Sequence, residues 1–212
     1  MSDLTAVLGA AAACTRCPPL VASRLRVVPG AGAPGARLLL VGAAPGREEE
    51  ARGAPLVGRA GALLDDLLGG AGIAREDVFR TTVVRCRPPG RDPQPAEVAA
   101  CRAWLHRIVE ELRPRVVAPL GSFATKVLRG DPAPIGRVHG QVEEREVGSL
   151  RVRLVALHHP DAALYAPAVL DALRADVARL PALLDLPPPV APAPAAAAAE
   201  DPGGQLGFPG IG

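Results

Sequence analysis

The stretch LLLVGAAPGREEEARGAPLVGRAG, residues 38–61, decides the fold of this chain. It opens with an apolar run whose length is typical of a buried strand. The Gly/Pro segment at residues 42–46 cannot continue a strand and predicts a tight turn. Three carboxylates follow at residues 48–50, and a second Gly/Pro segment leads into a helical pattern of leucines. An open α/β sheet places its ligand at such a strand end, although an ordinary βα turn with solvated acids shows the same pattern.

The same alternation of strands and helices continues along the chain. Apolar runs predict strands over residues 37–41, 78–85, 115–120 and 150–157. Helical spacing predicts helices over residues 4–13, 60–69, 95–112, 121–128 and 162–184, the last interrupted at its prolines. Pro18 and Pro19 are expected to stop the first helix. The pattern predicts an α/β fold with three αβα layers around a central, mainly parallel four-stranded sheet.

The length of 212 residues suits one domain and a tail. We expect a domain over residues 1–184 and a disordered tail over residues 185–212, because residues 187–199 are only Pro, Ala and Val. No signal peptide pattern and no apolar run near the length of a membrane span is present, so we expect a cytoplasmic protein.

Charge is uneven along the chain. The formal net charge of +2 is too small to indicate a nucleic-acid partner. Arg80, Arg85, Arg87 and Arg91 nevertheless lie in a segment without any acid. Such a basic stripe is typical of a phosphate contact and equally of a solvated edge.

Four cysteines are present, Cys14, Cys17, Cys86 and Cys101. In a cytosolic chain they are not expected to form structural disulfides. The C-x2-C spacing of the first pair lets one turn point two thiolates at one metal centre. Four thiolates suit zinc or a [4Fe–4S] cluster. The number of residues between Cys86 and Cys101 in the sequence is not that of a zinc ribbon. This favours the cluster, with zinc as the rival and four unrelated buried cysteines as the third interpretation.

Taken together, these motifs resemble the type-4, iron–sulfur uracil-DNA glycosylases. The resemblance covers residues 14 to about 180. It rests on the first cysteine pair, GAAPG at 42–46, PLVGRAG at 55–61, VVRCRPP at 83–89, Cys101, and His159-Pro160. It implies a [4Fe–4S] cluster on the four cysteines and excision of uracil from DNA by hydrolysis of the N-glycosidic bond. We expect a monomer.

The resemblance also implies roles for single residues. The base pocket is assigned to Gly42, Ala43, Ala44, Pro45, Gly46, Leu56 and Thr82. By position in the motif, the catalytic carboxylate is Glu49, with Glu50 beside it, and the donor to the leaving base is His159. The grip on the DNA backbone is assigned to Arg85, Arg87 and Arg91.

Three of these positions depart from the family pattern. Ala43 replaces a glutamate, Leu56 replaces a phenylalanine that stacks on the base, and Thr82 replaces an asparagine that reads the uracil edge. Loss of the ring removes stacking worth roughly 1–3 kcal/mol per base. A glycosylase-fold protein that binds DNA or senses damage, with weak or altered base specificity, is therefore the alternative. A nucleotide-binding α/β enzyme is disfavoured, because neither G-x-G-x-x-G nor a P-loop lysine is present.

The tail carries one further motif. Gln205, Leu206 and Phe208 resemble the short peptides by which bacterial repair enzymes dock on the replication sliding clamp, held away from the domain by a Pro-rich spacer. The usual clamp peptide has one more apolar residue between its leucine and its phenylalanine. A tail with two stray apolar residues is the other interpretation.

Overall fold

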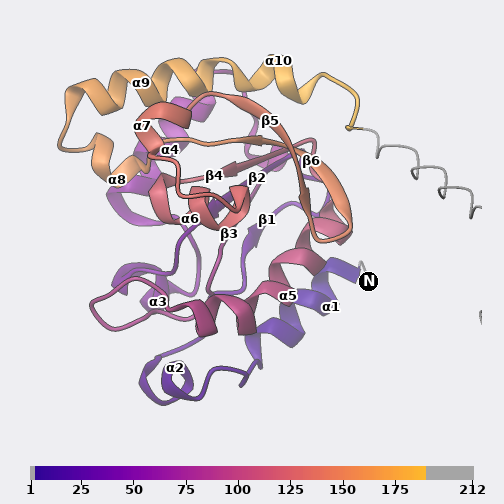
Figure 1. Ribbon diagram of the computed structural model, residues 1–212, viewed down its shortest axis with the longest axis vertical. Coiled ribbons are helices and arrows are strands. Elements are labelled where there is room, and N and C mark those ends of the chain that lie inside the picture. Colours follow the sequence, from indigo (N-terminus) through magenta and orange to yellow (C-terminus); the bar gives the residue numbers. More distant parts are fainter. Residues whose placement is uncertain (1–2, 190–212) are drawn as a thin grey trace, which may run out of the picture.

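Four parallel strands form the centre of the structure, a computed structural model that describes residues 3–189 (Figure 1). They are β2 (Leu38–Gly42), β3 (Val78–Thr82), β4 (Val116–Pro119) and β6 (Leu150–Val155). Strand β2 pairs with β3 on one side and β4 on the other, and β4 pairs with β6. All four overlap the segments predicted as strands, so the parallel core of the fold is confirmed.

Two antiparallel strands extend this sheet at its edges. Strand β1 (Ala31–Gly32) pairs with β3, and β5 (Val142–Val147) pairs with β6, which gives the order β1-β3-β2-β4-β6-β5. The sheet therefore has six strands where four were predicted. Strand β1 is too short to leave a pattern, and β5 is mostly charged, as edge strands that resist further pairing often are.

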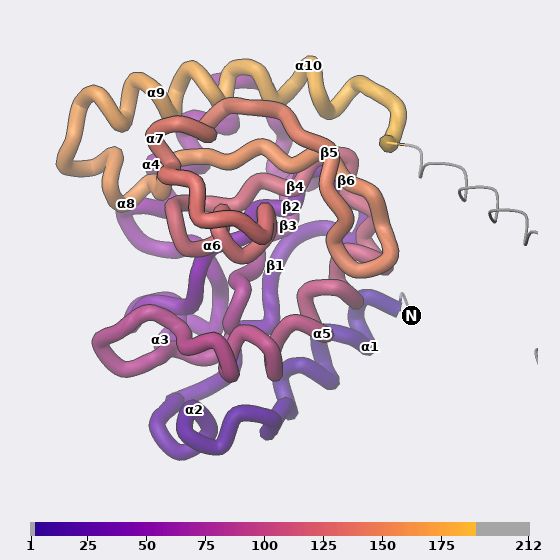
Figure 2. The backbone as a smooth tube through the Cα atoms, viewed as in Figure 1, coloured from indigo at the N-terminus to yellow at the C-terminus, as the bar shows by residue number. Residues whose placement is uncertain are grey.

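Helices cover both faces of the sheet, because successive side chains of each central strand point to opposite faces. Leu39 and Val41 pack in one apolar core, and Leu38 and Leu40 pack in the other. The first core is covered by α1 (Asp3–Ala12), α5 (Pro95–Leu112) and α6 (Gly121–Arg129). The second is covered by α4 (Gly58–Gly70), α9 (Pro167–Ala178) and α10 (Leu180–Leu184). Figure 2 shows α1 alongside α5. The three-layer prediction is confirmed.

Several short helices lie where loops were expected. They are α2 (Pro18–Ser23), α3 (Arg47–Arg52), the 3-10 turn Arg75–Asp77 and α7 (Ile135–Val138). Helix α8 (Pro160–Ala163) begins two residues before the helix predicted at the C-terminus. Pro18 and Pro19 begin α2 instead of only stopping α1, because a proline in the first turn of a helix loses no hydrogen bond. The long helix predicted at the C-terminus is divided into α8, α9 and α10.

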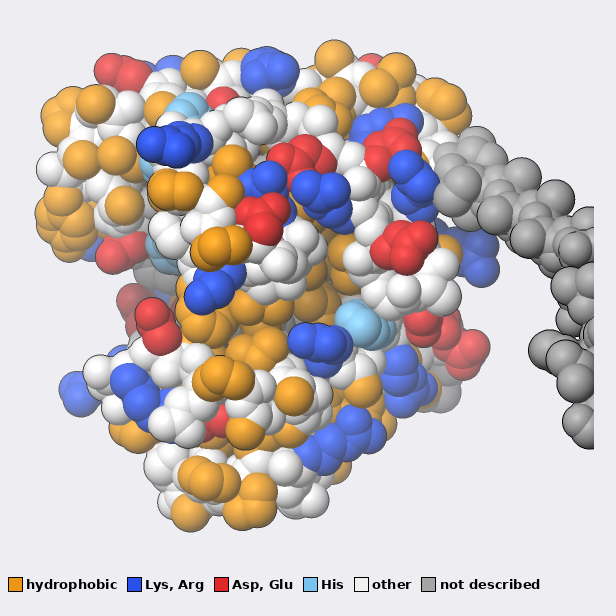
Figure 3. All heavy atoms as spheres, in the orientation of Figure 1, with side chains coloured by type: hydrophobic (Ala, Val, Ile, Leu, Met, Phe, Trp, Pro, Cys, Tyr) orange, Lys and Arg blue, Asp and Glu red, His pale blue; other side chains and the backbone are white. Residues whose placement is uncertain are grey.

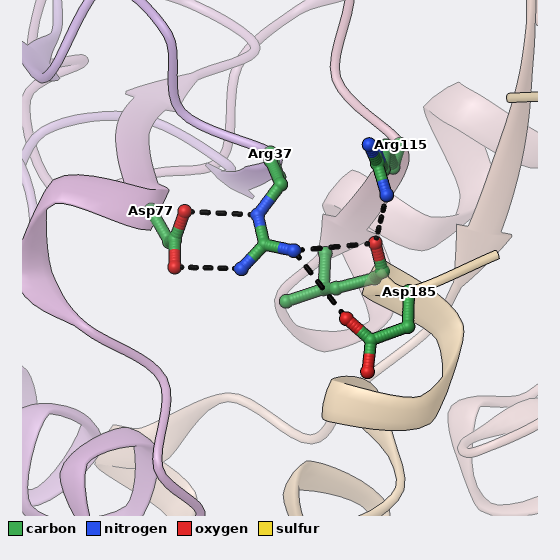
Figure 4. Close-up of polar contacts among 5 residues, drawn as sticks. Arg37, Asp77, Arg115 and Asp185 are labelled. Carbon is green, nitrogen blue, oxygen red and sulfur yellow. Dashed lines mark hydrogen bonds and ion pairs between the residues drawn. The ribbon is translucent and has the colours of Figure 1, made fainter. Parts of the chain in front are cut away.

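A polar cluster joins the last helix to the starts of the central strands (Figure 4). The Arg37 guanidinium binds Asp77 in a two-pronged pair at 2.8 and 2.9 Å, and this pair holds the pKa of Asp77 below its usual range. Arg37 also reaches Asp185, and Arg115 donates to the Leu184 carbonyl at 2.7 Å. Helix α10 is thus fixed at the edge where the parallel strands begin. The domain boundary at residue 184 stays a prediction, and the tail motif at residues 205–208 lies outside the described residues.

Across residues 3–189, no helix combines the length and apolar character that crossing a membrane requires.

Candidate active site and cysteine cavity

The ends of the four parallel strands converge, as the sequence predicts for one edge of a parallel sheet. Gly42, at the end of β2, lies in register with Thr82 at the end of β3. Beyond them, the Gly42 carbonyl accepts a hydrogen bond from Val83 N at 2.8 Å. On the other side, a Cβ added to Gly121 would lie 3.0 Å from Cβ of His159. Between these two pairs, Leu120 N at the end of β4 donates to the Val41 carbonyl of β2 at 2.9 Å, so the loops after all four strands lie at one edge of the sheet.

Thr82 is buried beside the glycine loop. Its hydroxyl donates to the Val84 carbonyl at 2.8 Å, and its methyl carbon lies 3.4 Å from the position that a Cβ on Gly42 would occupy. Val84 N in turn donates to the Ala43 carbonyl at 3.0 Å. The only hydroxyl proton of Thr82 is thus used inside the protein. Its oxygen keeps lone pairs for a ligand but offers no second donor.

Glu49 joins the two Gly/Pro segments of the opening motif. It lies in the first turn of α3, and its Oε2 accepts from Gly46 N at 2.5 Å. Its Oε1 accepts from Leu56 N. One half-buried carboxylate therefore holds the two Gly/Pro segments together, and backbone N–H donors from both segments orient it.

Leu56 is held in an unusual conformation. Its φ is +52°, in the left-handed region that side chains other than glycine rarely adopt, and its side chain is buried. Gly61 makes this possible, because any Cβ there would collide with the Leu56 carbonyl. Backbone strain of this kind persists only where its surroundings enforce it, as Glu49 and Gly61 do here.

His159 caps the short helix α8. Its Nδ1 accepts from Asp161 N at 3.2 Å, so in the neutral ring the proton lies on Nε2. Burial lowers the pKa of His159 below its ordinary value of 6.5, while the charges of Asp161 and Glu49 partly raise it again. The ring is therefore neutral at pH 7 and presents an N–H donor.

Glu50 points away from Glu49. It is buried, its Oε1 accepts from Leu25 N at 2.9 Å, and its Oε2 accepts from Arg87 Nε at 2.6 Å. Both carboxylate oxygens are thus engaged in holding the segment after α2 and the loop after β3. This geometry gives Glu50 a positioning role.

The predicted DNA-contacting arginines lie in three different environments. Arg87 is paired with Glu50, and Arg91 makes a two-pronged pair with Glu97 at 2.6 and 2.9 Å. Arg85 is only 1% exposed. The assignment of Arg85 to the DNA backbone is therefore corrected, because a buried guanidinium cannot meet a phosphate at the surface.

The four cysteines line one small cavity, together with Arg24, Arg85 and Trp104. All four are free thiols. Trp104 Nε1 donates to Cys14 Sγ at 3.2 Å, Arg24 Nη1 to Cys86 Sγ at 3.2 Å, and Arg85 Nη1 to Cys101 Sγ at 3.6 Å. Burial, followed by the charges of the other three cysteines, raises the pKa of Cys17 to about 11.

The spacing of these sulfurs matters for what they can hold. Within residues 3–189, no group of three or more His, Cys, Asp or Glu side chains is arranged to hold a metal ion. Zinc requires Zn–S bonds of about 2.3 Å, so its sulfurs lie within about 4 Å of one another. A four-iron cluster is larger and keeps its thiolates further apart. The four cysteines line one cavity beside a buried guanidinium whose Nε and Nη2 have no partner, so the residues present suit an anionic group held by thiolates.

Other residues of this region carried little or no sequence signal. Gly121 follows the third predicted strand, and a glycine directly after a strand end was the available signal. Arg24 and Trp104 come from segments that no motif marks, so only the fold shows that they face the cysteines.

Figure 3 shows an apolar hollow elsewhere, between α5 and α6. Its volume is about 560 Å³, and Val98, Phe123 and Val127 are among the side chains that line it. It contains neither Glu49 nor His159, so we do not assign the chemistry to it.

The effect of the Glu49 charge on the pKa of His159 is testable. Replacing Glu49 by glutamine removes a charge that raises the pKa of His159, so this pKa should fall further below 6.5. The measurement is an NMR titration of the His159 ring. Glu48→Gln is the matched control, because the Glu48 side chain is exposed and paired with Arg52 at 2.6 Å, and it should leave the titration unchanged. An unchanged His159 pKa in Glu49→Gln would show that the Glu49 charge does not act on the His159 ring.

Known proteins resemble this chain over most of its length. A profile described as the Uracil DNA glycosylase superfamily matches residues 29–180. The type-4 uracil-DNA glycosylase of Archaeoglobus fulgidus is 38% identical over 85% of this chain and 92% of its own length. That of Saccharolobus solfataricus is 34% identical over 89% of each chain, and the type-5 uracil-DNA glycosylase of Thermus thermophilus is 36% identical over 59% of this chain and 72% of its own. The chain belongs to the uracil-DNA glycosylase superfamily.

Proposed function

We propose that this protein is a type-4 uracil-DNA glycosylase, a hydrolase that flips uracil out of DNA and cleaves its N-glycosidic bond. The observation that carries this proposal is the placement of Glu49 and a neutral His159 in the loops that follow β2 and β6, each oriented there by backbone N–H donors. Family membership and the relatives named above support it.

The two side chains match the charges that the reaction develops. Cleavage builds positive charge on the sugar and negative charge on the departing base. The Glu49 carboxylate, oriented by Gly46 N and Leu56 N, stabilises the sugar cation or orients the attacking water. His159, whose Nδ1 is occupied by Asp161 N, donates its Nε2 proton in a hydrogen bond to the base anion. Because both groups are held by backbone contacts, little reorganisation is needed at the moment of reaction.

In this proposal, the remaining residues assigned from the sequence line the base pocket, contact DNA phosphates or position those that do. Residues 42–46, Leu56 and Thr82 form the walls of the base pocket. Arg87 uses only its Nε on Glu50, so both Nη groups remain for a DNA phosphate, and Arg91 on the same loop is a second candidate. Glu50 holds Arg87 in place and has no direct part in the chemistry.

Excision assays test the proposal directly. Wild-type protein should release uracil from DNA in a single-turnover experiment. Glu49→Gln and His159→Ala should each lower this rate by about 10²-fold or more, with a much smaller effect on DNA binding. Glu48→Gln is the control and should keep the wild-type rate. Absence of excision from uracil and from every other deaminated base by wild-type protein would contradict the proposal.

The second candidate is a DNA-binding or damage-sensing protein of the same fold with weak or altered base specificity. It is favoured by the pocket, where the hydroxyl proton of Thr82 is used by Val84 and no aromatic ring stands at Leu56. The same assay decides between the two when hypoxanthine and other deaminated bases are included. The triple variant Ala43→Glu, Leu56→Phe, Thr82→Asn should raise uracil release where these positions line the pocket, and an unchanged rate would remove them from it.

We further propose that Cys14, Cys17, Cys86 and Cys101 hold one [4Fe–4S] cluster, as type-4 family members usually do. The shared cavity and the N–H donors to three of the four sulfurs support this assignment. When bound, the cluster supplies iron–thiolate bonds that tie the segment after α1 to the β3 loop and to α5.

Analysis of iron and sulfide in protein purified without oxygen tests this assignment. About four of each per chain, with the visible absorption of an iron–sulfur protein, is the expected result. Cys101→Ser should lose most of this content, because it removes one of the four ligands. A colourless protein with one zinc ion per chain would show that the assignment is wrong.

For the tail, residues 185–212, we propose docking on the replication sliding clamp through Gln205, Leu206 and Phe208, in a cytoplasmic, monomeric enzyme. The Pro/Ala segment before these residues and their spacing support it. A labelled peptide of residues 200–212 should bind the clamp saturably in a fluorescence anisotropy titration. The Leu206→Ala, Phe208→Ala peptide is the control and should not bind. No binding by the original peptide at high micromolar clamp would end the proposal.

A further inference from the structure

Arg85 occupies an unusual position for an arginine. It is one of the largest fully buried side chains, with 1% of its surface exposed. Its Nη1 donates to Cys101 Sγ at 3.6 Å, while Nε and Nη2 have no partner. No carboxylate pairs with it anywhere in the described part of the chain. A buried charge without a partner is strongly destabilising, so something at this position has to neutralise it.

The nearby acids are already committed to other cations. Glu50 binds Arg87, and Glu97 binds Arg91 with both of its oxygens. What remains around Arg85 is sulfur, because Cys14, Cys17, Cys86 and Cys101 line the same cavity. The negative charge that Arg85 needs therefore comes from thiolates, or from a group that thiolates hold.

We propose that Arg85 is the buried counter-charge of the group bound by the four cysteines, so that loading of this group and the Arg85 charge stabilise each other. The inference rests on the cluster proposed above. The core of an oxidised four-iron cluster carries fewer positive charges than its four thiolates carry negative ones, so the loaded group is an anion. Arg85 lies at its buried side, and Arg24, which donates to Cys86 at 3.2 Å, lies at its half-buried side.

This role makes the effect of Arg85 depend on the state of the cavity. In the loaded protein its charge is neutralised and favourable. In the metal-free protein the cavity offers no carboxylate, so the same charge is a cost. A residue that only fills space would affect both states in the same direction. The sign of the effect therefore separates a counter-charge from a packing role.

The test compares thermal unfolding of the full chain in its loaded and metal-free forms, under anaerobic conditions. Arg85→Met keeps the length of the side chain and removes its charge. It should lower the Tm of the loaded protein and raise the Tm of the metal-free protein. Arg85→Lys keeps the charge and should follow the wild type in both forms. Arg107→Met is the control, because this arginine is exposed and lies over Trp104 at 5.7 Å from the ring centre. It should leave the Tm of the loaded form and the Tm of the metal-free form unchanged.

Shifts of the same sign in both forms of Arg85→Met would overturn the inference. Loss of iron to a chelator gives a second readout, which should be at least tenfold faster in Arg85→Met and within a few-fold of wild type in Arg85→Lys. If Arg85→Met does not fold, Arg85→Gln replaces it. If both neutral variants fail to fold while Arg85→Lys folds and takes up iron normally, the counter-charge is supported. If all three variants fail to fold, the shape of the arginine side chain is what the site requires, and the inference is overturned. Wild-type protein that takes up no iron would instead overturn the cluster itself, and the inference with it.

Discussion

Strand β2 has a parallel partner on each side and an apolar core on each face, and the rest of the molecule depends on this position. All five of its residues are buried. A strand in this environment has no exposed edge and no polar face, so its sequence must be apolar throughout, and the chain must turn sharply where it ends. The glycine loop is that turn. Because β3, β4 and β6 run in the same direction, their loops open at the same edge as the glycine loop.

Carboxylates hold these loops together in a way that a simple acidic patch would not. Glu49 accepts from two backbone N–H groups, and Glu50 accepts from Leu25 N and Arg87. Glu97 likewise accepts from Gln94 N at 2.8 Å while it pairs with Arg91. Each acid satisfies backbone donors that helix starts and irregular loops leave open. Polar side chains therefore hold the backbone of the loops at the strand ends.

The parts of the fold that follow from repeated patterns were predictable, and the parts that depend on single contacts were not. The central strands show as continuous apolar runs, and α5 is long enough for its helical apolar period to show. The two-residue β1 and the charged β5 have no such period. The three acids after the glycine loop were identified, but not their separation: on a helix of 3.6 residues per turn, neighbours point about 100° apart, so Glu49 and Glu50 face different parts of the protein. Arg85 was misassigned because a charge in the sequence indicates a surface until the fold shows that it is buried.

The polar cluster of Figure 4 also sets where the end of α10 lies. Arg37 and Arg115 stand at the beginnings of β2 and β4, and they hold Leu184 and Asp185 there. The glycine loop and His159 stand beyond the other ends of the same strands, a full strand length away. The end of α10 is therefore held on the side of the molecule opposite to the glycine loop and His159, so the last described helix leaves that edge of the sheet uncovered.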